Sequence, residues 1–302
     1  MDRQIESILV PTDGSDGARV GSRRAVDLAA RVDADLHVLS VVETRETAGV
    51  TGGQGDGTGS DRDEQLHAAA REAVDREADL ARAHLSGDVS TTVEDGVPHE
   101  VITEYAGRHD VDLIVMGTHG RSGVERLLLG SVGEKTLRTA TVPVVLVPPA
   151  ADVVDIGEGS YDRILVPTDG SEEAADAVEW GISLATALDG TIHGLYAVDT
   201  SYFTGVADTG AIYDALERTG RDALEAIRSR ARAADVDVVG NLATGPAARA
   251  ILDYAAEHEV DAIAMGTHGR SGVERYLIGS VTETVVRRAD VPVCCVPPGD
   301  GD

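Results

Sequence analysis

Glycine and serine recur at a fixed spacing in two nearly identical stretches of the chain. MGTHGRSGVERLLLGSV spans residues 116–132, and MGTHGRSGVERYLIGSV spans residues 265–281. Glycine removes a side chain where the backbone must turn or approach a ligand closely. The serine after the last glycine begins a predicted helix, whose first N–H groups attract anions. This spacing favours a loop that binds an anion, particularly a polyphosphate, in each half of the chain.

A second repeated stretch adds a carboxylate to each half. ILVPTDGS spans residues 8–15 and returns at residues 164–171. Its apolar beginning predicts a buried strand, and Asp13 or Asp169 follows directly. A carboxylate there could accept hydrogen bonds from ribose hydroxyls or hold a phosphate-bound Mg²⁺ ion, and the Ser131 hydroxyl could add a hydrogen bond.

Histidine and arginine occupy the same places in both glycine-rich stretches. His119 and His268 could contact phosphate, or they could stabilise the turn by a hydrogen bond. Arg121 and Arg270 follow closely and could neutralise phosphate charge, or pair with a nearby glutamate. Both interpretations stay open for each pair.

Several better-known sites are disfavoured by the sequence. GSVGEKT at residues 130–136 resembles a Walker loop superficially, but its counterpart GSVTETV contains no lysine. The dinucleotide pattern G-x-G-x-x-G is absent after the first predicted strand. No cysteine, histidine and carboxylate set has the spacing of a metal site, and no nucleophile has an attendant base. We therefore expect no catalytic residues, and we interpret Asp112 and Asp261 as solvated starts of strands.

The repeated loops need a scaffold of alternating strands and helices. In the first half we expect strands at Ile5–Val10, Asp35–Val42, Val89–Glu94, Asp112–Met116 and Val144–Val147, and helices at Asp16–Arg31, Arg62–His84, His99–Arg108 and Ser131–Thr139. Continuously apolar strands that alternate with helices predict a parallel sheet covered on both faces. Ligands of such doubly wound sheets bind beyond the carboxyl ends of the strands, where both repeated stretches lie.

The repeats divide the chain into two domains, which we place at residues 1–150 and 151–302. Its 302 residues also exceed what one hydrophobic core usually organises. We expect the boundary within Pro148–Asp162, and a flexible glycine-rich loop at Thr44–Asp61 that makes the first copy longer.

Composition limits the partners and the compartment. The formal net charge of −27 repels nucleic acids and anionic membranes, so we expect neither as a partner. An acidic surface with one lysine, Lys135, is typical of a halophilic protein, because about 1 M salt shortens the Debye length to about 3 Å; an acidic mesophilic protein is the alternative. Cys294 and Cys295 are adjacent and apolar in context, and we expect small core residues in a reducing cytoplasm. No apolar stretch predicts a signal peptide or a membrane span.

The pattern G-x2-G-x9-G-S, together with ILVPTDGS and the ending VPVVLV, resembles the ATP-binding branch of the universal stress protein family. The resemblance covers both halves and implies a tandem, two-domain form. It implies in each half a five-stranded parallel α/β sheet of order 3-2-1-4-5, like that of the adenine nucleotide alpha hydrolases. It also implies that the final strands of the two halves pair within the chain as a pseudo-dimer, and leaves a homodimer open.

The resemblance further implies two ATP sites, with Mg²⁺ bound through the nucleotide and contacting Asp13 and Asp169. Other adenine nucleotides remain open as ligands. The expected site of the first half consists of Pro11, Thr12, Asp13, Val41, Met116, Gly117, His119, Gly120, Arg121, Gly130, Ser131 and Val132. The expected site of the second half consists of Pro167, Thr168, Asp169, Ala197, Met265, Gly266, His268, Gly269, Arg270, Gly279, Ser280 and Val281. Because Ala197 is smaller than Val41, we expect weaker adenine packing in the second site.

The expected function is ATP binding in a stress response or in nucleotide-dependent regulation, with a protein partner that the sequence does not identify. Two alternatives stay open: slow Mg²⁺-dependent ATP hydrolysis, and a protein-interaction module that binds no nucleotide. Signatures of adenylyl transfer, HxGH and SGGxDS, do not occur.

Overall fold

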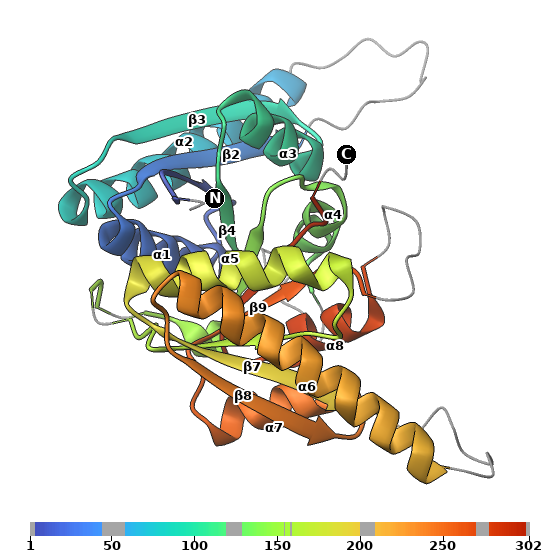
Figure 1. The fold of residues 1–302 in the computed structure, drawn as a ribbon. Helices are drawn as coiled ribbons and strands as arrows, with labels where there is room; N and C mark the ends of the chain where they lie inside the picture. Colours follow the sequence, from blue (N-terminus) through green and yellow to red (C-terminus); the bar gives the residue numbers. More distant parts are fainter. Residues whose placement is uncertain are drawn as a thin grey trace, which may run out of the picture.

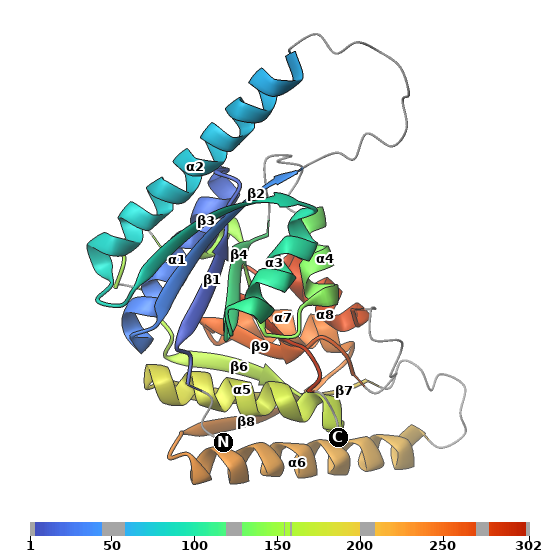
Figure 2. The same cartoon turned by 90° about the horizontal axis from the view of Figure 1, so that it is seen from above.

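A computed structural model describes residues 4–43, 58–118, 129–153, 155–157, 159–199, 209–269 and 278–299. These residues form one ten-stranded sheet that helices cover on both faces (Figures 1 and 2). The first half contributes β1 (Ser7–Pro11), α1 (Asp16–Val32), β2 (Asp35–Glu43), α2 (Thr58–His84), β3 (Val89–Gly96), α3 (Pro98–Arg108), β4 (Leu113–Gly117), α4 (Ser131–Thr139) and β5 (Val144–Val147). A short 3₁₀ turn, η1 (Pro149–Ala151), follows β5.

The second half repeats the same succession of elements. It contributes β6 (Arg163–Pro167), α5 (Glu172–Leu188), β7 (Thr191–Val198), α6 (Thr209–Ala233), β8 (Val238–Thr244), α7 (Ala247–Glu257), β9 (Ala262–Gly266), α8 (Ser280–Arg288) and β10 (Val293–Val296). The duplicated sequence therefore folds into two duplicated units.

The strand order joins the two units into one sheet. The order is β3-β2-β1-β4-β5-β10-β9-β6-β7-β8, and all neighbours within a half are parallel. In the order of its own strands each half reads 3-2-1-4-5. At the centre β5 pairs antiparallel with β10, with Val145 opposite Cys294. The predictions of two doubly wound α/β units and of an intrachain strand pair are confirmed.

Apolar residues on alternating strand positions separate the core into two layers. One layer packs against α1, α2, α5 and α6, and the other against α3, α4, α7 and α8. Cys294 lies in the first layer and Cys295 in the second, because successive strand side chains point to opposite faces. Both thiols are buried and free, as expected for small core residues.

Serine caps begin the first helix of each half. The Ser15 hydroxyl accepts a hydrogen bond from the Ala18 N–H at 3.2 Å, and the Ser171 hydroxyl accepts one from the Ala174 N–H at 3.3 Å. Both helices end at an aspartate in the left-handed conformation, Asp33 with φ 58° and Asp189 with φ 54°. The caps fix where each helix leaves the loop that follows β1 or β6.

Three details differ from the sequence-based expectations. Helix α2 begins at Thr58, inside the segment expected to be a loop; the rest of that segment, residues 44–57, lies outside the described residues. Strand β1 spans Ser7–Pro11, whereas the sequence predicted a strand at Ile5–Val10. Asp112 and Asp261 are not merely solvated, because Asp112 Oδ2 accepts the Glu6 and Ser7 N–H groups at 2.9 and 3.0 Å. Asp261 Oδ2 accepts the Arg163 N–H at 2.9 Å. Each aspartate satisfies backbone donors where the neighbouring strand begins.

None of the helices that the structure describes is long and apolar enough to cross a lipid bilayer.

Candidate functional site

The carboxyl ends of β1 and β4 lie side by side because these two strands are paired in parallel. Ile8 is opposite Leu113 in the first half, and Ile164 is opposite Ala262 in the second. From β1 the chain passes to β2 on one side, whereas β4 lies on the other side. The carboxyl ends of β1 and β4 therefore form the switch point at which ligands of doubly wound sheets bind.

The loop after β1 is a tight turn held by its own side chains. The Thr12 N–H donates to the Leu39 carbonyl at 2.8 Å, and Thr12 Oγ1 accepts the Gly14 N–H at 3.2 Å. Asp13 Oδ1 accepts the Ser15 N–H at 3.0 Å. Gly14 has φ +77°, a conformation that side chains disfavour. These contacts fix the Asp13 carboxylate at the edge of the sheet.

The second half contains the same turn, with nearly the same hydrogen bonds. The Thr168 N–H donates to the Leu195 carbonyl at 2.9 Å, and Thr168 Oγ1 accepts the Gly170 N–H at 3.1 Å. Asp169 Oδ1 accepts both the N–H and the hydroxyl of Ser171, at 3.0 and 2.6 Å. The extra hydroxyl contact is the main difference from the first half.

Helix α4 presents an open N-terminus at the same edge of the sheet as this turn. Gly130 is its N-cap, with φ −59° and ψ 142°, and no side chain caps the helix. The Gly130 N–H donates to the Thr118 carbonyl at 2.8 Å, and the Glu134 N–H donates to the Gly130 carbonyl at 2.9 Å. The N–H groups of Ser131, Val132 and Gly133 precede the first intrahelical bond and have no acceptor inside the helix.

Helix α8 begins in the same way. Its N-cap Gly279 has the same φ of −59° and ψ of 142°, again without a side-chain cap. The Gly279 N–H donates to the Thr267 carbonyl at 2.8 Å, and Thr282 Oγ1 donates to the Gly266 carbonyl at 2.8 Å. The strand end and the helix start are thus tied together, which holds the open N–H groups in a fixed position.

His268 and Gly269 connect the loop after β9 to the loop after β6. His268 Nδ1 lies 2.9 Å from Thr267 Oγ1, as expected for a turn-stabilising histidine. Its Nε2 is buried and has no hydrogen-bond partner among the described residues. A Cβ atom on Gly269 would lie 3.0 Å from Asp169 Oδ2, so the two loops touch at this glycine. The site therefore joins a carboxylate, an imidazole nitrogen and backbone N–H groups.

Helix packing accounts for glycine at position 117. A Cβ atom there would lie 2.0 Å from the carbonyl oxygen of Gly17 in α1, closer than any real contact. At the equivalent Gly266 the nearest atom would be the His268 carbonyl oxygen at 3.1 Å. Gly117 thus allows α1 to lie against the end of β4, a requirement that exists without any ligand.

The structure places most of the expected site residues at the carboxyl edge of the strands. In the first half these are Pro11, Thr12, Asp13, Val41, Gly117, Gly130, Ser131 and Val132, and in the second half Pro167, Thr168, Asp169, Ala197, Gly266, His268, Gly269, Gly279, Ser280 and Val281. Met116 and Met265 differ, because both are buried in the core layer beneath α4 and α8. His119, Gly120, Arg121 and Arg270 lie outside the described residues.

The residues present fit a nucleotide. The open N–H groups of α4 and α8 and the serine hydroxyls suit phosphate oxygens, and the partly exposed Val41 and Ala197 offer apolar contact for a base. Among the described residues no cluster of three or more histidine, cysteine, aspartate and glutamate side chains could hold a metal ion. A Mg²⁺ ion at Asp13 or Asp169 would take its other ligands from phosphate and water.

Two threonines of the site were not singled out from the sequence. Thr118 and Thr267 are buried, and their carbonyl groups accept the N–H of the N-cap glycines. Their position inside the repeated MGTHG was the available signal. A backbone role carries no chemical signature of its own, so only repetition could have indicated it.

Comparison with known proteins identifies relatives of both halves. A family model described as the universal stress protein family matches residues 4–148 and again residues 160–297. A universal stress protein of Methanocaldococcus jannaschii is 34% identical over 147 residues, which cover 48% of this chain and 86% of that protein. A universal stress protein of Synechocystis sp. is 24% identical over 305 residues, which cover 96% of this chain and 99% of that protein.

A solved structure has the same tandem fold. The crystal structure of a universal stress protein from Archaeoglobus fulgidus superimposes with a TM-score of 0.72 at 22% sequence identity, covering 99% of this chain and 98% of that one. At this identity the similarity shows the fold alone.

Proposed function

The chain belongs to the universal stress protein family, and we propose that it binds ATP at two related sites. One site lies at the carboxyl ends of β1 and β4, and the other at those of β6 and β9. The observation that carries the proposal is the uncapped helix start, at Gly130 and at Gly279, beside a turn that presents a carboxylate. Backbone N–H groups that no protein group caps are suited to the phosphates of a nucleotide.

Each part of the nucleotide has a matching group in this proposal. The N–H groups of Ser131 and Val132, or of Ser280 and Val281, bind the phosphates, and the serine hydroxyls add hydrogen bonds. Bound Mg²⁺ neutralises phosphate charge, with Asp13 or Asp169 contacting the ion or the ribose. Val41 and Ala197 pack against adenine.

The buried Nε2 of His268 supports phosphate binding in the second site. A buried polar atom without a partner is costly, and a phosphate oxygen would supply that partner. The protonated or Nε2–H form of the imidazole would donate to it. Nucleotide occupancy at the two sites would then regulate the part that the chain takes in a stress response.

Isothermal titration with Mg²⁺ and ATP tests the proposal. The unmodified chain is expected to bind two ATP molecules. Gly130→Val and Gly279→Val, made separately, are each expected to bind one, because a branched side chain at the N-cap obstructs the approach of phosphate to the helix start. A tenfold or greater weakening of one site is expected, equal to about 1.4 kcal/mol.

Gly107→Ala is the matched control, since a Cβ atom at Gly107 meets nothing within 4 Å and the glycine lies in α3, away from the site. This variant should keep both sites. Absence of ATP binding by the unmodified chain, or retention of two sites by both valine variants, would contradict the proposal. Circular dichroism of each variant establishes that it is folded.

A further inference from the structure

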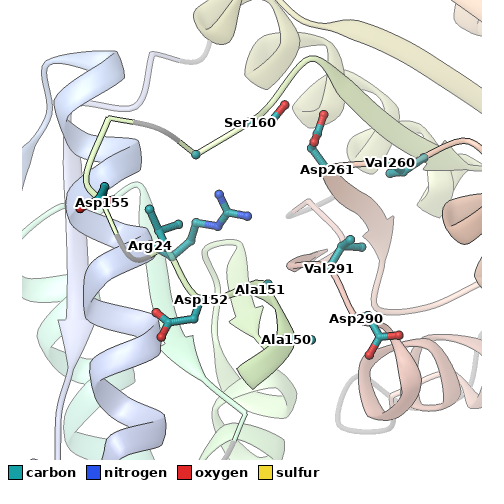
Figure 3. A pocket seen from close by; sticks show the side chains of 12 residues that line it. Arg24, Ala150, Ala151, Asp152, Asp155, Ser160, Val260, Asp261, Asp290 and Val291 are labelled. Carbon is teal, nitrogen blue, oxygen red and sulfur yellow. The ribbon is translucent and has the colours of Figure 1, made fainter.

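A cavity of about 390 Å³ lies between the two halves, away from the nucleotide sites (Figure 3). Helix α1 borders it on one side, the segment after β5 on another, and the loops before β9 and β10 on the third. Its charged and polar lining consists of Arg24, Asp152, Asp155, Ser160, Asp261 and Asp290. Ala150, Ala151, Val153, Val260 and Val291 make up its apolar lining.

The segment between the halves is fastened to α1, so the cavity wall is a built structure. The fully buried Asp27 accepts the Gly157 N–H at 2.6 Å and the Gly159 N–H at 3.4 Å. Arg31 Nη2 donates to the Gly157 carbonyl at 2.9 Å and also to the Gly159 carbonyl. These contacts fasten Gly157 and Gly159 to α1.

An ion pair between Arg23 and Asp152 fixes the same wall. Arg23 Nε donates to Asp152 Oδ1 at 2.7 Å, and Arg23 Nη2 donates to the other carboxylate oxygen. This bidentate pair neutralises Asp152. Of the lining carboxylates, Asp155 and Asp290 are exposed, and Asp261 already accepts a backbone N–H.

Arg24 is a buried cation without a carboxylate partner. It is 8% exposed, and in the part of the chain that the structure describes its Nε and Nη1 atoms have no hydrogen-bond partner. The Asp27 carboxylate lies near Arg24, since both crowd the position of a Cβ atom on Gly159, but the two form no ion pair within 4.0 Å among the described residues. The Arg24 guanidinium also lies over the Tyr161 ring, 4.9 Å from its centroid. Figure 3 shows the guanidinium projecting into the cavity. Buried guanidinium donors without hydrogen-bond acceptors are costly, so an anionic group in the cavity that accepts from Arg24 would stabilise it.

The second half shows that the fold does not require this arginine. When Ser15 is aligned with Ser171, Trp180 occupies the place of Arg24. Trp180 is 3% exposed, and its indole Nε1 donates to Cys294 Sγ at 3.0 Å. An aromatic side chain therefore fills that position in the second half.

We infer that this cavity binds a small zwitterion, a molecule of the amino-acid class that carries one carboxylate and one ammonium group. The carboxylate is bound by Arg24. The ammonium group lies toward Asp261 and Asp290 on the opposite wall (Figure 3), and the apolar residues contact the carbon chain between them. The surplus of lining carboxylates would repel a simple anion, and Arg24 would repel a simple cation.

Such a ligand contacts both halves at once. Arg24 belongs to the first half, whereas Asp261 and Asp290 belong to the second. Binding should therefore stabilise the whole chain against unfolding, because a ligand that binds only the folded state raises the midpoint of unfolding.

Thermal unfolding and isothermal titration with defined probes test the inference. The probes are glycine, β-alanine and 4-aminobutyrate, which space the two charges differently, with acetate and methylammonium as singly charged controls at the same ionic strength. At least one zwitterion is expected to bind saturably, at least tenfold more tightly than either control, and to raise Tm by several degrees at about 100 times its Kd.

Variants assign the binding to the cavity. Arg24→Gln is expected to weaken zwitterion binding at least tenfold, whereas Arg24→Lys retains part of it. Asp290→Asn changes an exposed residue and preserves the fold. This variant should bind the zwitterion more weakly and acetate more tightly than the unmodified chain does. Arg221→Gln is the matched control, because Arg221 pairs with Glu217 on α6, outside the cavity lining. This variant should bind the zwitterion and acetate as the unmodified chain does.

Three results would overturn the inference. The first is no binding of any zwitterion at tens of millimolar. The second is acetate binding as tightly as the zwitterions, which would indicate a plain anion site. The third is unchanged zwitterion affinity in both Arg24→Gln and Asp290→Asn.

Discussion

At the scale of single residues, each half contains a cluster of two histidines and a tyrosine near the amino ends of its strands. The first histidine cluster consists of His37, Tyr105 and His109, and the second of His193, Tyr254 and His258. His37 Nδ1 lies 3.0 Å from the Tyr105 hydroxyl, and His193 Nδ1 lies 2.9 Å from the Tyr254 hydroxyl. The remaining histidine packs on the tyrosine ring, at centroid distances of 4.1 and 4.0 Å.

The environment of each cluster opposes protonation of the histidine on the strand. Burial lowers the pKa of His37 below its ordinary value of 6.5, and nearby His109 lowers it further, while Asp35 raises it. Burial likewise lowers the pKa of His193, with His258 and Arg163 adding to the effect and Asp261 opposing it. The unfolded chain therefore binds protons at a higher pH than the folded chain does at these two positions.

We expect the free energy of unfolding to decrease as the pH falls below about 6.5, the ordinary histidine pKa, toward the lowered pKa values. Above that pH both states are neutral at these positions, and the full stability is present. The double variant His37→Gln/His193→Gln should show a shallower loss of Tm between about pH 7 and pH 5.5. Thermal unfolding followed by circular dichroism measures the slope.

The control for this prediction is His84→Gln, because His84 is exposed on α2 and bonds only to the local Leu80 carbonyl. Its slope should equal that of the unmodified chain. His67 acts in the opposite direction, since the Asp63 carbonyl and the Asp95 carboxylate raise its pKa. Equal slopes for the double variant and the unmodified chain would show that the histidine clusters do not set the pH dependence.

At the scale of elements, the serine caps connect the candidate sites to the helices behind them. The hydroxyls of Ser15 and Ser171 each accept an N–H of the first helical turn. The backbone N–H of each serine donates to the aspartate two residues earlier in the chain. The cap and the site carboxylate therefore belong to one hydrogen-bonded turn.

Ser15→Ala is expected to lower the free energy of unfolding by about 1 kcal/mol, because it leaves one helix N–H without its acceptor. Ser171→Ala should cost more, since its hydroxyl also donates to Asp169 Oδ1 at 2.6 Å. Urea unfolding of both variants gives the comparison. Ser171→Thr keeps the hydroxyl and serves as the control; a cost for Ser171→Ala no larger than for Ser15→Ala would refute the added contribution.

Elements with local signals could be predicted from the sequence, whereas long-range contacts could not. The predicted helix starts at Asp16 and Ser131 agree with the structure. At the first of them the Ser15 cap acts on Ala18, a residue only three positions away. The start of α2 was placed too late, because a helix can extend into polar residues once its later turns are packed. Asp112 and Gly117 have partners on other elements, Ser7 and Gly17, which sequence spacing does not reveal.

The same distinction applies to the sites. Duplication drew attention to the loops after β1 and β4, and the structure pairs the two strands from which these loops leave. The second half has Trp180 at the place of Arg24, so repetition gave no indication of the cavity beside Arg24. It arises where α1, the linking segment and two distant loops meet.

At the scale of the whole molecule, the net charge of −27 should oppose the approach of ATP. We expect the association rate constant for ATP to rise about tenfold between about 0.1 M and 1 M KCl, because salt shortens the range of the repulsion to about 3 Å. Stopped-flow measurements with a fluorescent ATP analogue follow the rate, and circular dichroism establishes that the chain is folded at each salt concentration.

Uncharged adenosine is the control for this prediction, since the protein field acts only weakly on a neutral molecule. Its association rate should be nearly independent of KCl. A salt-independent rate for the ATP analogue would show that the local charge at the site, and not the total charge, governs the encounter.

The antiparallel pair of β5 and β10 determines how the two halves respond to dilution. Two separate one-domain chains joined through such a strand pair would dissociate at low concentration and exchange partners with other copies. Here residues 148–162 link β5 of the first half to β6 of the second half, so each half meets the other at an effective concentration of about millimolar, whatever the abundance of the protein. One half with Val41 and one half with Ala197 therefore always occur together. The duplication gives a fixed one-to-one ratio of two unequal halves. Separate subunits could reach this ratio only if each bound the unlike subunit in preference to its own kind.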